Sequence, residues 1–329
     1  MQTSEILQMN EKAQVANEER QSNKVKDWLQ LIKPSLSIMV VFSSVVSYLL
    51  VPNIEEKYAN PWLMSVLLFL GGMLVTGSAN AINQVVEKDT DAMMKRTAKR
   101  PVAEGRMSVN EGWAFAIICG VAGVGILGYY FNWLSAGIAL FSLFLYAFVY
   151  TPLKKVSAIA VLVGAIPGAL PCLIGWTAGA NELSTGGWVL FAIQFLWQFP
   201  HFWAIAWVAH GDYSNAGFKL LPSDKGPTKF TALQTVLYSL ALIPVCAIPY
   251  MIEMSGVTSL IIVTLTNIFL IIQCVRLYRE NSVKAARRVM FSSYIHLPIV
   301  LLALLNDKLS PAAEASLSSI LKQVHLLLV

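Results

Sequence analysis

The densest cluster of charge in the chain lies in residues 83–101, NQVVEKDTDAMMKRTAKRP, directly after an uncharged apolar stretch at 62–82. On a helix, Asn83, Glu87 and Asp91 fall four residues apart and share one face. Two carboxylates at that spacing repel each other, so we expect a cation to lie between them. Mg²⁺ is a hard ion that takes oxygen ligands. The spacing therefore predicts a metal site at this end of the apolar stretch.

Basic side chains follow these acids within about two helical turns. They are Lys95, Arg96, Lys99 and Arg100. Because Mg²⁺ is usually held by one or two carboxylates together with substrate phosphates, acids beside bases at a membrane surface predict binding of a lipid-like diphosphate. The alternative is a solvated positive loop in which Asp91 pairs with Lys95.

A second acidic residue, Asp212, follows the apolar segment at 187–208. Its position resembles that of Glu87 and Asp91, which follow an apolar segment of their own. Two acidic groups at one membrane face can bind two metal ions, or clamp one diphosphate from both sides. The alternative is that Asp212 caps a loop helix that begins near Ser214.

The connection YTPLKKVS adds Tyr150, Lys154 and Lys155. Paired lysines at a membrane boundary are ordinarily anchors on the cytoplasmic side. If they share a membrane face with the acids, they are also candidates for contact with the diphosphate.

One histidine, His201, lies inside an apolar segment that also contains Trp197 and Trp203. An imidazole among aromatic rings is more often a hydrogen-bonded core residue than a ligand. An ionisable group within a membrane segment is nevertheless a functional candidate.

Membrane helices must position these residues, because hydrophobic residues make up 56% of the chain and charged residues only 13%. Soluble domains carry about 25% charged residues. A window of about twenty residues predicts an all-α polytopic membrane protein, with nine transmembrane helices around a central cavity. The predicted segments are 35–51, 62–82, 112–131, 134–150, 157–177, 187–208, 231–252, 257–275 and 289–305.

The fifth segment is rich in residues that interrupt or narrow a helix. They are Gly164, Pro167, Gly168, Pro171 and Gly175. Such residues permit close helix packing, or a kink beside a cavity. We expect this helix to form a wall of an internal chamber.

Most of the 24 Lys and Arg residues lie before the first segment or in alternate connections. This asymmetry predicts a cytoplasmic (inner) membrane protein whose N-terminus and acidic loops are cytoplasmic and whose C-terminus is outside. We expect a polar cytoplasmic tail at 1–27, a nine-helix domain at 28–305 and an extracytoplasmic tail at 306–329. The net charge of +5 would favour the anionic headgroups of the bilayer, and it does not indicate nucleic acid.

The four cysteines are widely spaced in apolar segments and contain no CxxC pair. They indicate small packing residues, and neither disulfides nor a metal site.

Together these strings resemble the UbiA-type intramembrane prenyltransferases, whose first motif is N-x3-D-x3-D, and within them the branch that farnesylates haem. The strings are LIKPSLS, DTDAMMKRTAKRPVAEGRMS, YTPLKKVSAIAVLVGAIPGALP, QFPHFWAIAW and DYSNAGFKLLP, and the resemblance covers about 28–305. It assigns Asn83, Glu87 and Asp91 to the first metal and diphosphate motif and Asp212 to the second. Two departures are Glu87, where an aspartate is usual, and Ala216, where a paired acid is expected, which leaves the number of metal ions open.

The resemblance also assigns Arg96, Arg100 and Lys154 to the diphosphate, with Lys95 and Lys155 as neighbours. It implies Mg²⁺ as cofactor, and farnesyl diphosphate and haem B as substrates. Farnesylation of a haem vinyl group with addition of water would give haem O. Haem A synthase or terminal oxidase assembly factors are the implied partners.

The same resemblance makes four residues candidates for contact with the haem or the prenyl chain. They are Tyr150, Trp197, His201 and Trp203.

Two other functions fit part of the pattern. A quinone-type aromatic prenyltransferase, with an acceptor such as 4-hydroxybenzoate, would share the first motif. A secondary transporter would place its charges near the bilayer midplane between inverted repeats, whereas here the acids follow the apolar segments.

Overall fold

The computed structural model describes residues 24–309. Residues 1–23 of the predicted N-terminal tail and 310–329 of the predicted C-terminal tail lie outside the described residues. Within 24–309 the chain is helical, and its only β-type pairing is a single bridge between Ser255 and Lys308.

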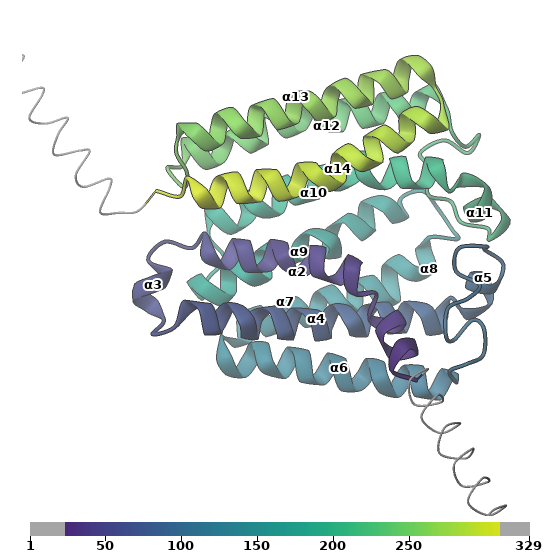
Figure 1. Ribbon diagram of the computed structural model, residues 1–329, viewed down its shortest axis with the longest axis horizontal. Helices are drawn as coiled ribbons and strands as arrows, with labels where there is room; N and C mark the ends of the chain where they lie inside the picture. Colours follow the sequence, from purple (N-terminus) through teal and green to yellow (C-terminus); the bar gives the residue numbers. More distant parts are fainter. Residues whose placement is uncertain (1–23, 310–329) are drawn as a thin grey trace, which may run out of the picture.

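The helices run back and forth along one direction, with short connections at the two ends of the bundle (Figure 1). The first described helix is Lys24–Ile32. The others are α2 (Pro34–Leu49), α3 (Ile54–Lys57), α4 (Pro61–Val86), α5 (Lys88–Ala92), α6 (Val109–Tyr130), α7 (Trp133–Phe144), the π-helix η1 (Leu145–Tyr150), α8 (Thr151–Leu153), α9 (Ala160–Ala180), α10 (Thr185–Val208), α11 (His210–Asn215), α12 (Lys229–Met251), α13 (Val257–Glu280) and α14 (Val283–Asn306).

Local sequence explains where several of these helices begin. Asn60 accepts a hydrogen bond from the Leu63 amide at the start of α4, where Pro61 is the first helical residue. Ser108 and Glu111 form a reciprocal capping box at the start of α6. Such caps satisfy amides that have no partner within the helix.

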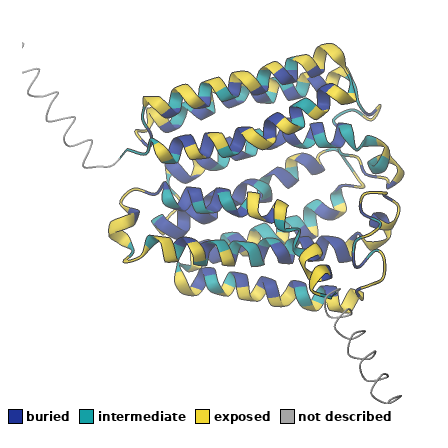
Figure 2. Ribbon diagram, in the orientation of Figure 1, coloured by how far each residue is buried: buried dark blue, intermediate teal, exposed yellow. Residues whose placement is uncertain are grey.

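Eight helices in the described residues are long and apolar enough to cross a membrane. A ninth span results if Lys24–Ile32 and α2, which are bent by 43° relative to each other, count as one. Large apolar side chains cover the outer sides of the bundle, for example along α6 and α13, where water would be an unfavourable neighbour (Figure 2). The chain is therefore a multi-pass membrane protein, as the sequence predicted.

The central element is α9, which is the most deeply buried of the candidate spans. It runs as one helix through Pro167 and Pro171. Its glycines meet neighbours at very short range: a Cβ atom at Gly175 would lie 1.8 Å from the Ser44 carbonyl oxygen of α2, and one at Gly168 would lie 2.0 Å from Gln198 Oε1 of α10. Close packing is thus the role of these small residues, while the predicted central cavity stays a prediction.

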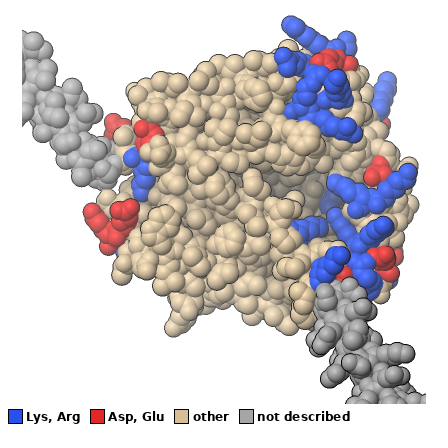
Figure 3. Space-filling model, in the orientation of Figure 1, with Lys and Arg blue, Asp and Glu red and all other residues tan. Residues whose placement is uncertain are grey.

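The charged side chains are distributed unequally between the two ends of the bundle. Lys and Arg gather at the end that carries α5 and α11 in Figure 1, and few charged groups interrupt the tan surface between the two ends (Figure 3). The four cysteines are free and buried, as expected of packing residues.

Gly175→Ala should lower the free energy of unfolding by about 1–3 kcal/mol, because the added methyl group must push α2 away from α9. Gly125→Ala is the matched control, since a Cβ atom there meets nothing within 4 Å. We expect its stability to be unchanged or slightly raised, because alanine favours a helix more than glycine does. Thermal unfolding of the two variants in detergent would test this, and equal melting temperatures would contradict the close approach.

Candidate functional site

Three connections meet at the charged end of the bundle. Met94, after α5, packs with Ala216 and Phe218, which follow α11. The amide of Lys219 donates a hydrogen bond of 2.8 Å to the carbonyl of Lys154, which ends α8. The loops after α4, η1 and α10 therefore form one surface, as the sequence predicted for the two acidic loops.

The first motif lies where α4 ends and α5 begins. The helix on which the sequence analysis placed Asn83, Glu87 and Asp91 is interrupted at Glu87, which caps α4 with φ −95° and ψ 14°. The spacing of one helical turn is kept across the break. The Glu87 amide donates to the Asn83 carbonyl, and the Asp91 amide donates to the Glu87 carbonyl. All three side chains are buried.

Glu87 is held from two sides. The Asn83 amide donates to Glu87 Oε2 at 2.8 Å, and Lys154 Nζ lies 2.7 Å from Glu87 Oε1. Lys154 Nζ also donates to Asn83 Oδ1 at 3.0 Å. Burial of a carboxylate is costly unless a cation and hydrogen bonds offset the lost hydration, and Lys154 and Asn83 supply both.

Asp91 has its own cation. Arg100 NH1 lies 2.6 Å from Asp91 Oδ2, and the Thr97 hydroxyl donates to the Asp91 carbonyl at 2.9 Å. Burial raises the pKa of the Asp91 carboxyl, and the nearby Arg100 guanidinium acts in the opposite direction. Lys95 is exposed, so the alternative pairing of Asp91 with Lys95 is wrong.

Each acid keeps one buried oxygen atom without a hydrogen bond. These atoms are Asp91 Oδ1 and Glu87 Oε1, and the latter has the Lys154 ammonium group 2.7 Å away. Buried polar atoms are rarely left unsatisfied, and carboxylate oxygens are the ligands that Mg²⁺ prefers. The residues present therefore fit a divalent ion.

The predicted basic residues occupy three different positions. Lys154 is buried and Arg100 is half-buried, and both face the acids. Arg96 donates to the Tyr213 hydroxyl at 2.9 Å and so joins the first acidic loop to α11. Lys95 and Lys155 are exposed at the edge of this surface.

Asp212 lies in the first turn of α11, half-buried. The helix begins at His210 and no side chain caps it, so the interpretation of Asp212 as a cap is wrong. Within residues 24–309, no three His, Cys, Asp or Glu side chains form a metal cluster, so Asp212 does not complete a set with Glu87 and Asp91.

The aromatic and histidine candidates lie in three places. Tyr150 lies beside the acids, with Lys154 Nζ 4.8 Å from its ring centroid. His201 is buried where α10 meets α14: its Nδ1 atom lies 2.8 Å from the Ser293 hydroxyl, and its ring stacks on Trp197 at 4.7 Å. Trp203 belongs to a separate apolar cluster with Phe199. His201 has the hydrogen bond expected of a core histidine.

Sequence reasoning missed Lys33, at the break between Lys24–Ile32 and α2. The carbonyls just before it, at Gln30, Leu31 and Ile32, accept hydrogen bonds from Gln84 and Asn80, which flank Asn83 on α4, so Lys33 lies next to the first motif. A lysine directly before a proline at the start of an apolar segment was the available signal.

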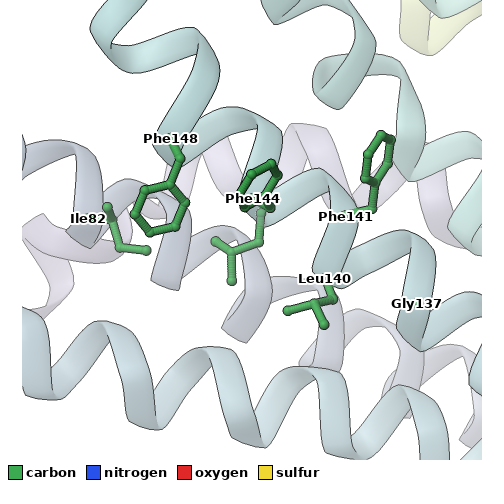
Figure 4. Close-up of a pocket in the computed structure, with 7 residues that line it drawn as sticks. Ile82, Gly137, Leu140, Phe141, Phe144 and Phe148 are labelled. Carbon is green, nitrogen blue, oxygen red and sulfur yellow. The ribbon is translucent and has the colours of Figure 1, made fainter.

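A pocket of about 470 Å³ lies between α4 and the α7–η1 segment. Phe141, Phe144 and Phe148 line it beside Ile82, the neighbour of Asn83 (Figure 4). The lining is apolar and its phenylalanines are exposed on the outside of the bundle. The pocket therefore adds no ligand for a metal or an anion.

Residues 40–295 match the UbiA prenyltransferase family. A protoheme IX farnesyltransferase of Cytophaga hutchinsonii is 45% identical over 282 residues, which cover 86% of this chain and 97% of that protein. A protoheme IX farnesyltransferase of Flavobacterium johnsoniae is 40% identical over 287 residues, which cover 86% and 94%.

Two solved structures share the fold. A structure described as digeranylgeranylglyceryl phosphate synthase has a TM-score of 0.70 at 22% identity and covers 87% of this chain and 98% of its own. A UbiA homologue from Archaeoglobus fulgidus, bound to GPP and Mg²⁺, has a TM-score of 0.61 at 15% identity and covers 84% and 99%.

Arg100→Met should lower the free energy of unfolding by about 3 kcal/mol, because it leaves the buried Asp91 carboxylate without its cation. Adding Asp91→Asn should restore part of the loss. Arg288→Met is the control, since its pair with Glu280 is partly exposed and contributes at most about 1 kcal/mol. Thermal unfolding at neutral pH would compare the three, and equal losses in the Arg100 and Arg288 variants would contradict a buried ion pair.

Proposed function

The chain belongs to the UbiA prenyltransferase family, and we propose that it transfers a farnesyl group from farnesyl diphosphate to the vinyl group of haem B, with addition of water, to form haem O. Two relatives named protoheme IX farnesyltransferase, at 45% and 40% identity over most of both chains, support this acceptor. The observation that carries the proposal is the pair of buried carboxylates at the junction of α4 and α5, each paired with its own cation.

Glu87 and Asp91 would hold Mg²⁺ through their carboxylate oxygens, with Asn83 fixing the Glu87 carboxylate. When bound, the metal ion supplies positive charge that stabilises the negative charge developing on the leaving diphosphate. Asp212 would act from the opposite side, on a second metal ion or on the same diphosphate. The solved UbiA homologue bound to GPP and Mg²⁺ supports a metal-dependent site of this kind.

Lys154 and Arg100 neutralise Glu87 and Asp91 in the present structure. If a metal ion takes over that neutralisation, both cations can turn to the diphosphate oxygens. Arg96 would contact the same group from the loop that Tyr213 steadies, and Lys95 and Lys155 would add positive potential at the rim.

The reaction begins with cleavage of the bond between the allylic carbon and the diphosphate oxygen, which keeps the bonding electrons. The vinyl group of haem then gives its electron pair to the allylic cation, and water adds to the resulting carbocation with loss of a proton. Apolar walls would keep water away from the first cation. Tyr150, beside the acids, and Trp197, His201 and Trp203 of α10 are the proposed contacts for the prenyl chain and the porphyrin.

Large apolar substrates explain a site at the end of membrane helices. The prenyl chain and the porphyrin can enter from the lipid while the diphosphate stays with the charged loops. The gathering of Lys and Arg at that end supports a position in the cytoplasmic membrane with the site facing the cytoplasm and the described C-terminal end outside.

Glu87→Gln and Asp91→Asn should each lower haem O formation by about a hundredfold or more, because they keep the shape of the side chain and remove the charge that holds the metal. Asp89→Asn is the matched control, since Asp89 belongs to the same short helix and is exposed. Membranes incubated with labelled farnesyl diphosphate and haem B, followed by pigment extraction and mass measurement, would give the product. Full activity in both site variants would refute the assigned role.

The acceptor and the metal can be tested in the same membranes. Label should enter haem B and not 4-hydroxybenzoate, and EDTA should abolish the transfer until Mg²⁺ is restored. Prenylation of 4-hydroxybenzoate alone would replace the proposed function with that of an aromatic prenyltransferase. Transfer that persists in EDTA would exclude a role for an exchangeable metal ion.

A further inference from the structure

The first membrane span is broken at Lys33, and the break follows from the sequence. A residue before proline avoids the right-handed helical region, and Lys33 precedes Pro34. Lys33 has φ 51° and ψ 67°, in the left-handed region, in place of the extended conformation that residues before proline usually adopt. Strained backbone of this kind persists only where the surroundings hold it in place.

Two side chains of α4 hold this break. Pro34 has no amide hydrogen for the Gln30 carbonyl, and Gln84 Nε2 supplies the missing donor at 3.0 Å. The same nitrogen lies 3.2 Å from the Leu31 carbonyl. Asn80 Nδ2 donates to the Ile32 carbonyl at 3.0 Å. Asn80 and Gln84 are buried and lie one helical turn apart, so they grip the broken span from a single face of α4.

The helix before the break is fixed on its other side as well. Arg106 Nε lies 2.9 Å from Asp27 Oδ1, and an Arg106 terminal nitrogen donates to Gln30 Oε1 at 3.0 Å. Arg106 belongs to the loop that carries Arg96 and Arg100. The position of Lys33 relative to that loop and to α4 is therefore determined from both sides.

This clamp places a cation next to the acidic site. Asn80 and Gln84 flank Asn83 on α4 and bond the carbonyls of Gln30, Leu31 and Ile32, which brings the next residue, Lys33, to the turn of α4 that carries Asn83. The two ion pairs of the site use Lys154 and Arg100, and Lys33 takes part in neither. Lys33 is half-buried, so its ammonium group has lost part of its hydration without gaining a carboxylate partner.

We propose that Lys33 is a binding residue for the diphosphate, and that the Asn80–Gln84 clamp on the broken first span positions it there. The inference rests on the proposed function and adds a group from the first span to the same site. Lys154 and Arg100 must serve both the two buried carboxylates and the incoming diphosphate, so a further cation beside them would strengthen diphosphate binding.

The test is binding of inorganic pyrophosphate with Mg²⁺ to the purified full-length protein in detergent, measured by calorimetry. Lys33→Met should weaken this binding by about tenfold or more, because the variant loses a charge-assisted hydrogen bond to the pyrophosphate. Lys33→Arg, which keeps the charge, should retain most of the affinity. Lys26→Met is the matched control, because Lys26 is exposed on the same helix, and its affinity should equal that of the unaltered protein.

A merely structural role for Lys33 would change other readouts. We expect Lys33→Met to raise the KM for farnesyl diphosphate while the KM for haem B and the melting temperature stay unchanged. Unaltered pyrophosphate affinity in Lys33→Met, or parallel losses in haem binding and stability, would overturn the inference. Failure of the unaltered protein to bind Mg²⁺ and pyrophosphate would instead overturn the proposed function, and this inference with it.

The clamp has its own test. Gln84→Ala should weaken pyrophosphate binding in the presence of Lys33, and should have little further effect when Lys33→Met is already in place. Additive losses in the double variant would show that Gln84 does not act through Lys33. Melting temperatures of all four proteins would identify any variant that loses affinity by unfolding.

Discussion

The neutralisation of two buried carboxylates at the end of α4 is the constraint on which the charged end of the molecule depends. Glu87 and Asp91 have lost their hydration and repel each other, so each requires a cation at short range. Lys154 comes from the α8 connection and Arg100 from the loop after α5. The Lys154–Glu87 pair therefore fastens the α8 connection to the end of α4, and the Arg100–Asp91 pair closes the loop after α5. The charges that stabilise the folded protein here are those that a metal ion and a diphosphate would rearrange.

The interior of the bundle provides the rigid frame for this end. The glycines of α9 bring α2 and α10 close to it. Polar side chains then reach backbone carbonyls of the next helix, as Gln198 of α10 does at the Ala165 carbonyl of α9. Within the lipid bilayer, a hydrogen bond between helices satisfies polar groups that have no water molecules as partners. The π-helix η1 ends at Tyr150, directly before the short helix that presents Lys154. Local departures from regular helix thus cluster near the site, where they direct side chains.

Family membership and local chemistry support each other in this protein. The relatives named protoheme IX farnesyltransferase cover most of the chain, and the ends of α4 and α10 present acids and bases on one surface. The alternative of a secondary transporter would need charges near the middle of the spans. Here Glu87 and Asp91 lie where α4 ends and α5 begins, and Asp212 lies in the helix that follows α10.

The sequence by itself determined the spans, the end at which charge gathers and the spacing of Asn83, Glu87 and Asp91. These properties depend on composition and on the helical period, which any stretch of chain carries locally. Only the tertiary structure decided that the helix breaks at Glu87, that Lys154 faces the acids while Lys155 is exposed, and that Arg100 is the partner of Asp91 in place of Lys95. Lys33 was overlooked for the same reason. Which of several nearby cations enters a buried site depends on contacts between segments far apart in the chain, such as Gln84 with the Gln30 carbonyl, and no local pattern encodes those contacts.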